Sequence, residues 1–108
     1  MRLRVSAREE DPGVTIYLVG EVDLESVPTV TDAVRSVLAG RPGRRVTVDL
    51  AGVTFLDASG IGALVQGGRL ARAAGWDYRL VGAQGMPLWV LTMTGILPAV
   101  EAGAAPNG

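Results

Sequence analysis

The stretch that decides the fold runs from Val48 to Val65 and reads VDLAGVTFLDASGIGALV. Its first half is an apolar, strand-like run that stops at Asp57. Its second half, from Ser59 onward, has apolar residues at helical spacing with glycines between them. The junction therefore predicts a strand followed at once by a helix, with the Ser59 hydroxyl at the start of that helix beside the Asp57 carboxylate.

A serine at the start of a helix is well placed to carry a phosphate. The first N–H groups of a helix have no partners within the helix, and the helix dipole adds positive charge there. A phosphate on Ser59 would add roughly −1.5 to −2 charges next to Asp57, and a partner that packs a carboxylate or an apolar surface there would not tolerate it. The same residues allow a plainer interpretation, in which Ser59 or Asp57 only caps the helix and contributes about 1 kcal/mol.

The composition argues against an enzyme. The chain has no histidine and no cysteine, so Ser59 lacks a base for nucleophilic catalysis, and ordinary zinc and haem sites are excluded. The sequence around Ser59 is not the G-x-S-x-G turn of serine hydrolases, and no G-x-x-x-x-G-K-[ST] phosphate loop is present. A carboxylate site for magnesium stays open in principle, but we expect no catalytic residue, no metal site and no cofactor.

Length and charge narrow the class of protein further. The 108 residues suit one domain, and the formal net charge of −1 gives no basic excess for nucleic acid. The chain begins without the apolar segment of a signal peptide, and no apolar run is long enough to cross a bilayer. We expect a cytoplasmic protein with no direct nucleic acid contact and no membrane insertion. Arg41, Arg44 and Arg45, the densest basic cluster, are expected to lie in a solvated turn.

Hydrophobic patterns predict the order strand, strand, helix, strand, helix, strand, helix along the chain. We expect strands at residues 3–7, 14–20, 45–50 and 78–82, with a possible edge strand at 96–100. We expect helices from a Ser26 cap to Gly40, from Ser59 to about Gly75, and from Met86 to about Thr94. Strands that alternate with helices imply a mostly parallel sheet, and the first hairpin adds an antiparallel edge. The fold class is therefore α/β, with a mixed sheet of four to five strands and three or more helices.

Glycines and tryptophans raise questions of packing. Gly62, Gly67 and Gly68 each cost about 1 kcal/mol against alanine inside a helix. They indicate either close packing of the helix on the sheet or a flat helix face that admits a partner. Trp76 and Trp89 are expected to pack at the margin of the core.

Three segments, in order, resemble the anti-sigma-factor antagonist branch of the STAS domain family. Residues 18–24 (LVGEVDL) resemble its first signature, in which a strand ends in Gly-Glu-x-Asp. Residues 48–62 resemble its central phosphorylation motif, and residues 91–96 (LTMTGI) resemble its closing helix and turn. The resemblance implies a single STAS-type domain over residues 1–100, followed by a flexible tail at 101–108.

The resemblance also implies a partner-switching function. In that family the unphosphorylated antagonist binds an anti-sigma factor serine/threonine kinase and so frees a sigma factor. The kinase phosphorylates the antagonist's serine, which breaks the complex, and a serine phosphatase restores it. By this resemblance Ser59 is the phosphate acceptor, and the protein is an anti-anti-sigma factor without enzymatic activity of its own.

The residues implied to face the partner gather around the two signatures. They are Asp23, Asp57, Ala58, Ser59, Gly60, Ile61 and Gly62. On local grounds Asp23 could equally be a turn or cap carboxylate between strand and helix. Many relatives carry a second hydroxyl residue where this chain has Ala58, so Ser59 is left as the only hydroxyl of the loop.

A second function belongs to a different class. Related STAS domains are binding subunits of membrane lipid-transport ATPase assemblies. In such a subunit the loop around Ser59 would contact an ATPase without being phosphorylated. Co-purification with a transport ATPase instead of a soluble kinase would favour this alternative.

Overall fold

The computed structural model of the protein describes residues 2–40 and 44–96. Within these ranges the chain forms four strands, three α-helices and one short 3₁₀ helix. The strands are β1 (Arg4–Glu10), β2 (Gly13–Val22), β3 (Arg45–Leu56) and β4 (Asp77–Val81). The helices are the 3₁₀ helix Leu24–Ser26, α1 (Val27–Leu38), α2 (Ala58–Ala73) and α3 (Gly85–Met93). The order of strands and helices is the predicted one.

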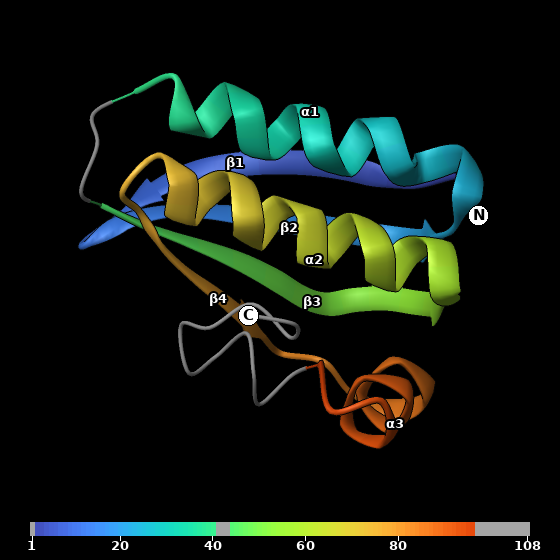
Figure 1. Ribbon diagram of the computed structural model, residues 1–108. Coiled ribbons are helices and arrows are strands. Elements are labelled where there is room, and N and C mark those ends of the chain that lie inside the picture. Colours follow the sequence, from blue (N-terminus) through green and yellow to red (C-terminus); the bar gives the residue numbers. More distant parts are fainter. Residues whose placement is uncertain (1, 41–43, 97–108) are drawn as a thin grey trace.

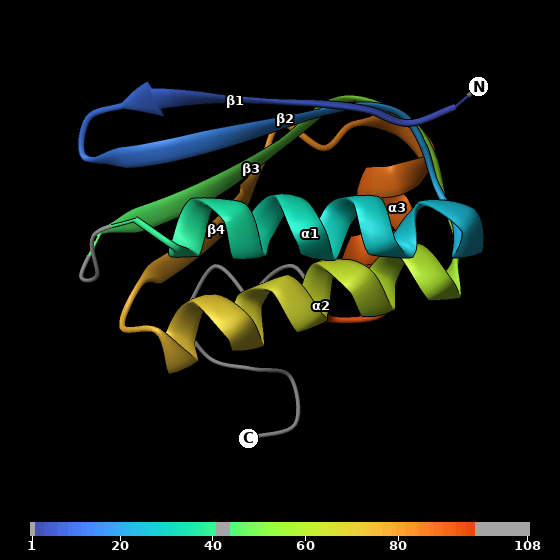
Figure 2. The same ribbon diagram turned by 90° about the horizontal axis from the view of Figure 1, so that it is seen from above.

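The four strands form one sheet in the order β1-β2-β3-β4 (Figure 1). β1 and β2 pair antiparallel, whereas β2 with β3 and β3 with β4 pair parallel. α1 and α2 lie side by side on the same face of this sheet (Figures 1 and 2). The expected α/β class, a mostly parallel sheet with an antiparallel edge and three helices, is confirmed. The possible edge strand at 96–100 falls outside the described residues, apart from Ile96.

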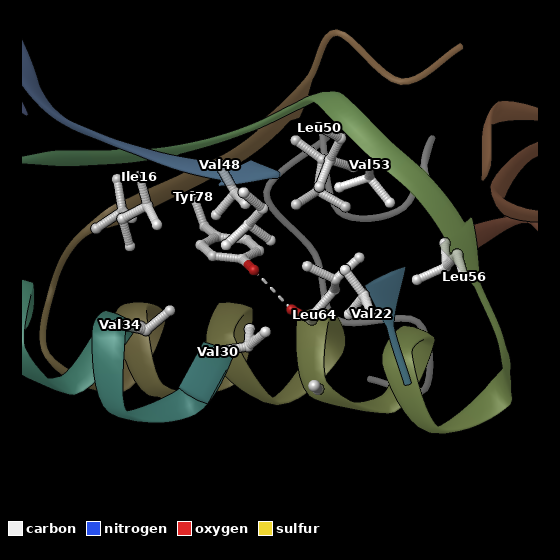
Figure 3. Close-up of a cluster of buried hydrophobic side chains, with 14 of the residues drawn as sticks. Ile16, Val22, Val30, Val34, Val48, Leu50, Val53, Leu56, Leu64 and Tyr78 are labelled. Atoms are coloured by element: carbon white, nitrogen blue, oxygen red, sulfur yellow. Dashed lines mark hydrogen bonds between the residues drawn. The ribbon is translucent and has the colours of Figure 1, made fainter. Parts of the chain in front are cut away.

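The core lies between the sheet and the two helices that cover it. Strand side chains alternate, so that Ile16 and Leu18 of β2 are buried while Tyr17 between them is only half-buried. The central cluster in Figure 3 is almost entirely aliphatic. It contains Ile16, Val22, Val30, Val34, Val48, Leu50, Val53, Leu56, Leu64 and Tyr78.

Tyr78 of β4 explains two of the three questioned glycines of α2. A Cβ atom on Gly67 or on Gly68 would come within 2.9 Å of the Tyr78 side chain. The Tyr78 hydroxyl donates a hydrogen bond of 2.7 Å to the Leu64 carbonyl, one turn before these glycines (Figure 3). Gly67 and Gly68 therefore serve close packing of α2 on the sheet. Gly62 differs, because a Cβ there would meet nothing within 4 Å.

Three local predictions were wrong. The strand range 45–50 was too short: β3 continues to Leu56, the end of the apolar run before Asp57, because its ladder with β2 continues through two irregularities and pairs Val22 with Leu56. Ser26 does not cap α1 with its side chain; its hydroxyl instead accepts a bond from the Asp23 backbone N–H at 2.8 Å. Trp76 is 4% exposed, as expected, but Trp89 is 64% exposed and does not lie at the core margin.

The arginine cluster also departs from the expected solvated turn. Arg41 lies outside the described residues. Arg44 is half-buried, and its guanidinium contacts the Glu9 carboxylate at 2.9 Å. Arg45 is the first residue of β3. Two of the three arginines are thus part of the sheet or anchored beside it.

Candidate functional site

A single residue, Asp57, separates β3 from α2. Its carboxylate accepts a hydrogen bond from the Gly60 N–H at 2.9 Å, and its carbonyl accepts one from the Ile61 N–H at 2.9 Å. Asp57 is therefore the N-cap of α2, which decides between the two caps that the sequence left open. Ser59 is the second residue of the helix, half-exposed on its first turn.

Asp23 lies near this junction although it is far away in sequence. β2 and β3 are parallel and reach the same edge of the sheet, where Val22 pairs with Leu56. The residues that follow, Asp23 and Asp57, therefore leave the sheet next to each other. The Asp57 N–H donates to the Val22 carbonyl at 3.4 Å, which ties the two strand ends together.

Gly60 is required by the same close approach. A Cβ atom on Gly60 would overlap the Val22 carbonyl and come within 2.8 Å of the Leu56 side chain. Gly60 is buried, whereas the neighbouring Ala58 and Gly62 are exposed. Among the implied partner-facing residues, Gly60 thus positions the loop against β2, and half-buried Ile61 packs against the core. The others present surface.

Asp23 has a clear structural task in the fold. Its carboxylate accepts from the Ser26 N–H at 3.2 Å, while the Ser26 hydroxyl accepts from the Asp23 N–H at 2.8 Å. This reciprocal pair is a capping box that starts the 3₁₀ helix before α1. The cap interpretation of Asp23 is therefore confirmed, and its half-exposed side chain remains part of the surface beside Asp57.

An open hollow of about 560 Å³ lies beside Asp23. It is lined by Arg2, Leu3, Glu21, Asp23, Glu25, Ser26 and Thr29. Three carboxylates and one guanidinium give this hollow a negative character, which opposes binding of a nucleotide or a free phosphate. The described part of the chain holds no group of three acidic, histidine or cysteine side chains placed to bind a metal ion.

Exposed apolar side chains on α3 are a feature that the sequence patterns missed. Leu88, Trp89 and Met93 all face solvent on a helix that lies at the same end of the molecule as the start of α2 (Figures 1 and 2). The helix is apolar on every side, so its periodicity gave no indication of which face is buried. The available signal was the absence of any charged residue from Gly85 to Met93.

Comparison with known proteins establishes the family. A family described as "Mlab, STAS domain" matches residues 5–97, so the chain belongs to the STAS domain family. The anti-sigma-B factor antagonist of Bacillus subtilis (strain 168) is 19% identical over 108 residues, which cover 100% of this chain and 97% of that protein. No helix within the described residues has the length and apolar character needed to cross a membrane.

Solved structures share the fold. An anti-sigma-factor antagonist (STAS) domain protein from Planctomyces limnophilus superposes with a TM-score of 0.71 at 21% identity, over 85% of this chain and 82% of that one. The anti-sigma factor antagonist SpoIIAA in its unphosphorylated form superposes with a TM-score of 0.70 at 21% identity, over 90% of this chain and 84% of that one. The expected STAS-type fold is therefore confirmed, and none of these names is that of an enzyme.

Proposed function

We propose that the protein is an anti-anti-sigma factor switched by phosphorylation of Ser59. Unphosphorylated, it binds an anti-sigma serine kinase and so frees a sigma factor; phosphorylated, it lets the kinase go. The observation that carries this proposal is the position of Ser59. Its hydroxyl belongs to the first turn of α2, at the surface, two residues beyond the Asp57 cap, at the edge of the sheet where β2 and β3 both end.

The electrostatics of the first turn explain how one phosphate can change an interface. The Asp57 carboxylate already occupies the Gly60 N–H. A phosphate on Ser59 would find part of the positive helix end neutralised, and it would add roughly −1.5 to −2 charges beside this carboxylate. A partner surface that fits the unmodified loop would then face strong repulsion, or would have to leave the phosphate desolvated.

The fold itself should tolerate the phosphate. Asp57 caps the helix, Gly60 packs against Val22, and neither contact uses the Ser59 hydroxyl. The switch then acts on the surface without refolding the domain. In the forward step the kinase transfers the γ-phosphoryl group of ATP to the Ser59 oxygen, ADP leaves, and the hydroxyl proton passes to a base of the kinase. A serine phosphatase resets the switch by hydrolysing the phosphate ester.

Mass spectrometry and binding measurements test the proposal together. The full chain is incubated with ATP, magnesium and anti-sigma serine kinases from the same genome, and its intact mass is recorded. We expect one added phosphate, absent in Ser59→Ala and retained in Thr54→Ala, the matched control at the nearest other hydroxyl. In binding assays Ser59→Ala should match the wild type, and Ser59→Asp should lose about tenfold or more in affinity, about 1.4 kcal/mol. Equal affinities of all three proteins would remove the switch.

A second function uses the same surface without modification. Because Asp57 completes the cap of α2 without any phosphate, the loop is fully formed as a docking surface for the ATPase of a membrane lipid-transport assembly. Co-purification of the wild-type and Ser59→Ala chains with a transport ATPase, together with no phosphorylation by any kinase, would favour this function over the first.

A further inference from the structure

One surface of the molecule has no role in the fold or in the Ser59 switch. It is the outer face of α3, where Trp89 is 64% exposed, Met93 is 67% exposed, and Met86 and Leu88 are 41% and 39% exposed. Met86, Trp89 and Met93 follow one another at spacings of three and four, so they share one side of the helix. We call Met86, Trp89 and Met93 the α3 face. Leu88 does not share their spacing and lies beside the buried side of the helix.

The α3 face is unusually apolar for a solvent-exposed helix. The opposite side of α3 is already packed, because Pro87 and Leu91 are buried. A helix that is apolar all round is normally buried all round. Side chains of this size at these exposures present on the order of 400 Å² of apolar surface, within the range of patches that are often functional. The surface therefore indicates a contact that the described residues 2–40 and 44–96 do not supply.

The size of the α3 face also says what kind of contact it can make. A standard protein interface takes about 800 Å² from each partner. The α3 face supplies about half of that area, which is too little for a stable dimer through this face alone. It must be continuous with further surface to serve in a specific complex.

The loop that carries Ser59 supplies further surface at the same end of the molecule. α3 and the first turn of α2 lie at the same end of the molecule in both views (Figures 1 and 2). The start of α3 is fixed to the strand that leads to this loop, since the Gln84 side-chain amide donates to the Ala51 carbonyl of β3 at 3.1 Å. Gly82 further holds the approach to α3 within contact of Asp49 and Ala51. The two surfaces are thus held on one rigid frame.

We propose that the α3 face is a second contact for the protein partner that binds the Ser59 loop, with Trp89 inserted into an apolar pocket of that partner. This inference rests on the proposed function, and it divides the interface into two parts. The α3 face contributes affinity that phosphorylation does not touch, and the Ser59 loop contributes the part that phosphorylation removes. Tryptophan in such a position is the side chain most often found to dominate an interface.

Binding titrations with the anti-sigma serine kinase, in the presence of ADP and magnesium, test this inference. Trp89→Ala should weaken binding of the unphosphorylated full chain about thirtyfold or more, which corresponds to the roughly 2 kcal/mol that truncation of a dominant interface residue costs. The affinity of Trp89→Phe should fall between those of the wild type and Trp89→Ala. Arg35→Ala, an exposed change on α1, is the control and should bind like the wild type. Thermal unfolding of all variants should agree closely, because the Trp89 side chain is mostly exposed.

The outcomes separate this inference from the proposed function. If the wild type binds, Ser59→Asp does not, and Trp89→Ala binds as well as the wild type, the α3 contact is refuted while the switch stands. If no kinase binds the wild type, the proposed function fails and the α3 contact falls with it. A dimer that Trp89→Ala abolishes would assign the α3 face to a second copy. If truncation after Ile96 shifts the Trp89 fluorescence towards that of a more exposed tryptophan, the α3 face would be assigned to residues 97–108. Either result overturns the proposal.

Discussion

Gly60 and Gly62, two glycines in the first turns of α2, lie in opposite environments. Gly60 is buried, and any side chain there would collide with the Val22 carbonyl. Gly62 is exposed, and a side chain there would meet nothing. Packing explains the first glycine and not the second. If a partner docks at the turn of Ser59, as proposed, the flat surface it needs would explain Gly62.

Gly62→Ala separates stability from binding. Alanine is favoured over glycine inside a helix by about 0.5–1 kcal/mol, so the free energy of unfolding in urea should rise by that amount. Affinity for the kinase should fall, because the added methyl group holds the partner away from the helix. Gly60→Ala is the contrasting variant and should lose stability. A Gly62→Ala protein that is more stable and binds unchanged would show that this helix face is free of the partner.

Asp57 combines two roles that one substitution can divide. Asp57→Asn keeps a good N-cap, so we expect the unfolding free energy to change by only a few tenths of a kcal/mol, roughly. Asp57→Ala removes the bond to the Gly60 N–H and should cost about 1 kcal/mol. If the carboxylate charge strengthens the switch, phosphorylated Asp57→Asn should keep more kinase affinity than the phosphorylated wild type. If the phosphorylated wild type and phosphorylated Asp57→Asn lose the same kinase affinity, the Asp57 charge has no part in the switch.

At this scale the sequence predicts a residue well when its role is local. The position of Ser59 at the start of α2 follows from the pattern of a few neighbours. The burial of Trp76, between α2 and β4, agrees with its expected place at the core margin. For Asp23 the sequence left two interpretations, a cap and a partner contact. The cap was not certain because it starts a short 3₁₀ helix, which the hydrophobic pattern does not predict. The exposure of Trp89 depends on which side of α3 meets β3, and a uniformly apolar helix carries no such information.

Among the elements, α2 and β4 are held together by Tyr78. The Tyr78 ring fills the space above Gly67 and Gly68, and its hydroxyl bonds to the Leu64 carbonyl at 2.7 Å. Tyr78→Phe keeps the ring and loses the hydrogen bond, so it should cost about 1 kcal/mol. Gly68→Ala should cost about 1–3 kcal/mol, because its methyl group would displace the ring. Chemical denaturation measures both, and a neutral Gly68→Ala would mean that β4 shifts freely under α2.

The elements themselves were mostly predictable, and their ends were not. Strand and helix order followed from alternation and helical spacing, because each element buries one side. The alternating pattern ended at residue 50, six residues before the end of β3 at Leu56, and only the apolar run before Asp57 indicated the longer strand. Alternation stops there because the pairing of β3 with β2 has irregular steps between Tyr17 and Val19 and between Gly20 and Glu21. Such steps are a property of two strands and cannot be read from one of them.

For the whole molecule, the absence of histidine leaves stability without a titrating side chain of ordinary pKa near neutral pH. One buried tyrosine matters at alkaline pH, because burial raises the pKa of Tyr78 above its ordinary value of 10.0. The folded state therefore holds the tyrosine proton more tightly than the unfolded chain does. The resulting stability is fully present below pH 10 and is lost as the pH rises further.

Unfolding measured across this range should show the effect. We expect a flat free energy of unfolding around neutral pH and a decline above about pH 10. Tyr78→Phe should flatten the decline. Tyr17→Phe should flatten it less, because Tyr17 is only half-buried and its pKa is raised mainly by the hydrogen bond that its hydroxyl donates to the Glu10 carboxylate. The chain has no lysine and no cysteine to titrate in the same range, so an unchanged slope in Tyr78→Phe would exclude Tyr78 as the cause.

The connection of a single residue between β3 and α2 has a consequence for how the serine is recognised. A kinase that threads its substrates as extended peptides would have to unwind the first turn of α2 and break the Asp57 cap to reach Ser59. A kinase that docks on the intact domain would meet the hydroxyl already in place. Such a kinase would recognise the folded surface around Ser59 more than the amino-acid sequence next to it. A synthetic peptide of residues 52–66 should be phosphorylated far more slowly than the folded chain at equal concentration.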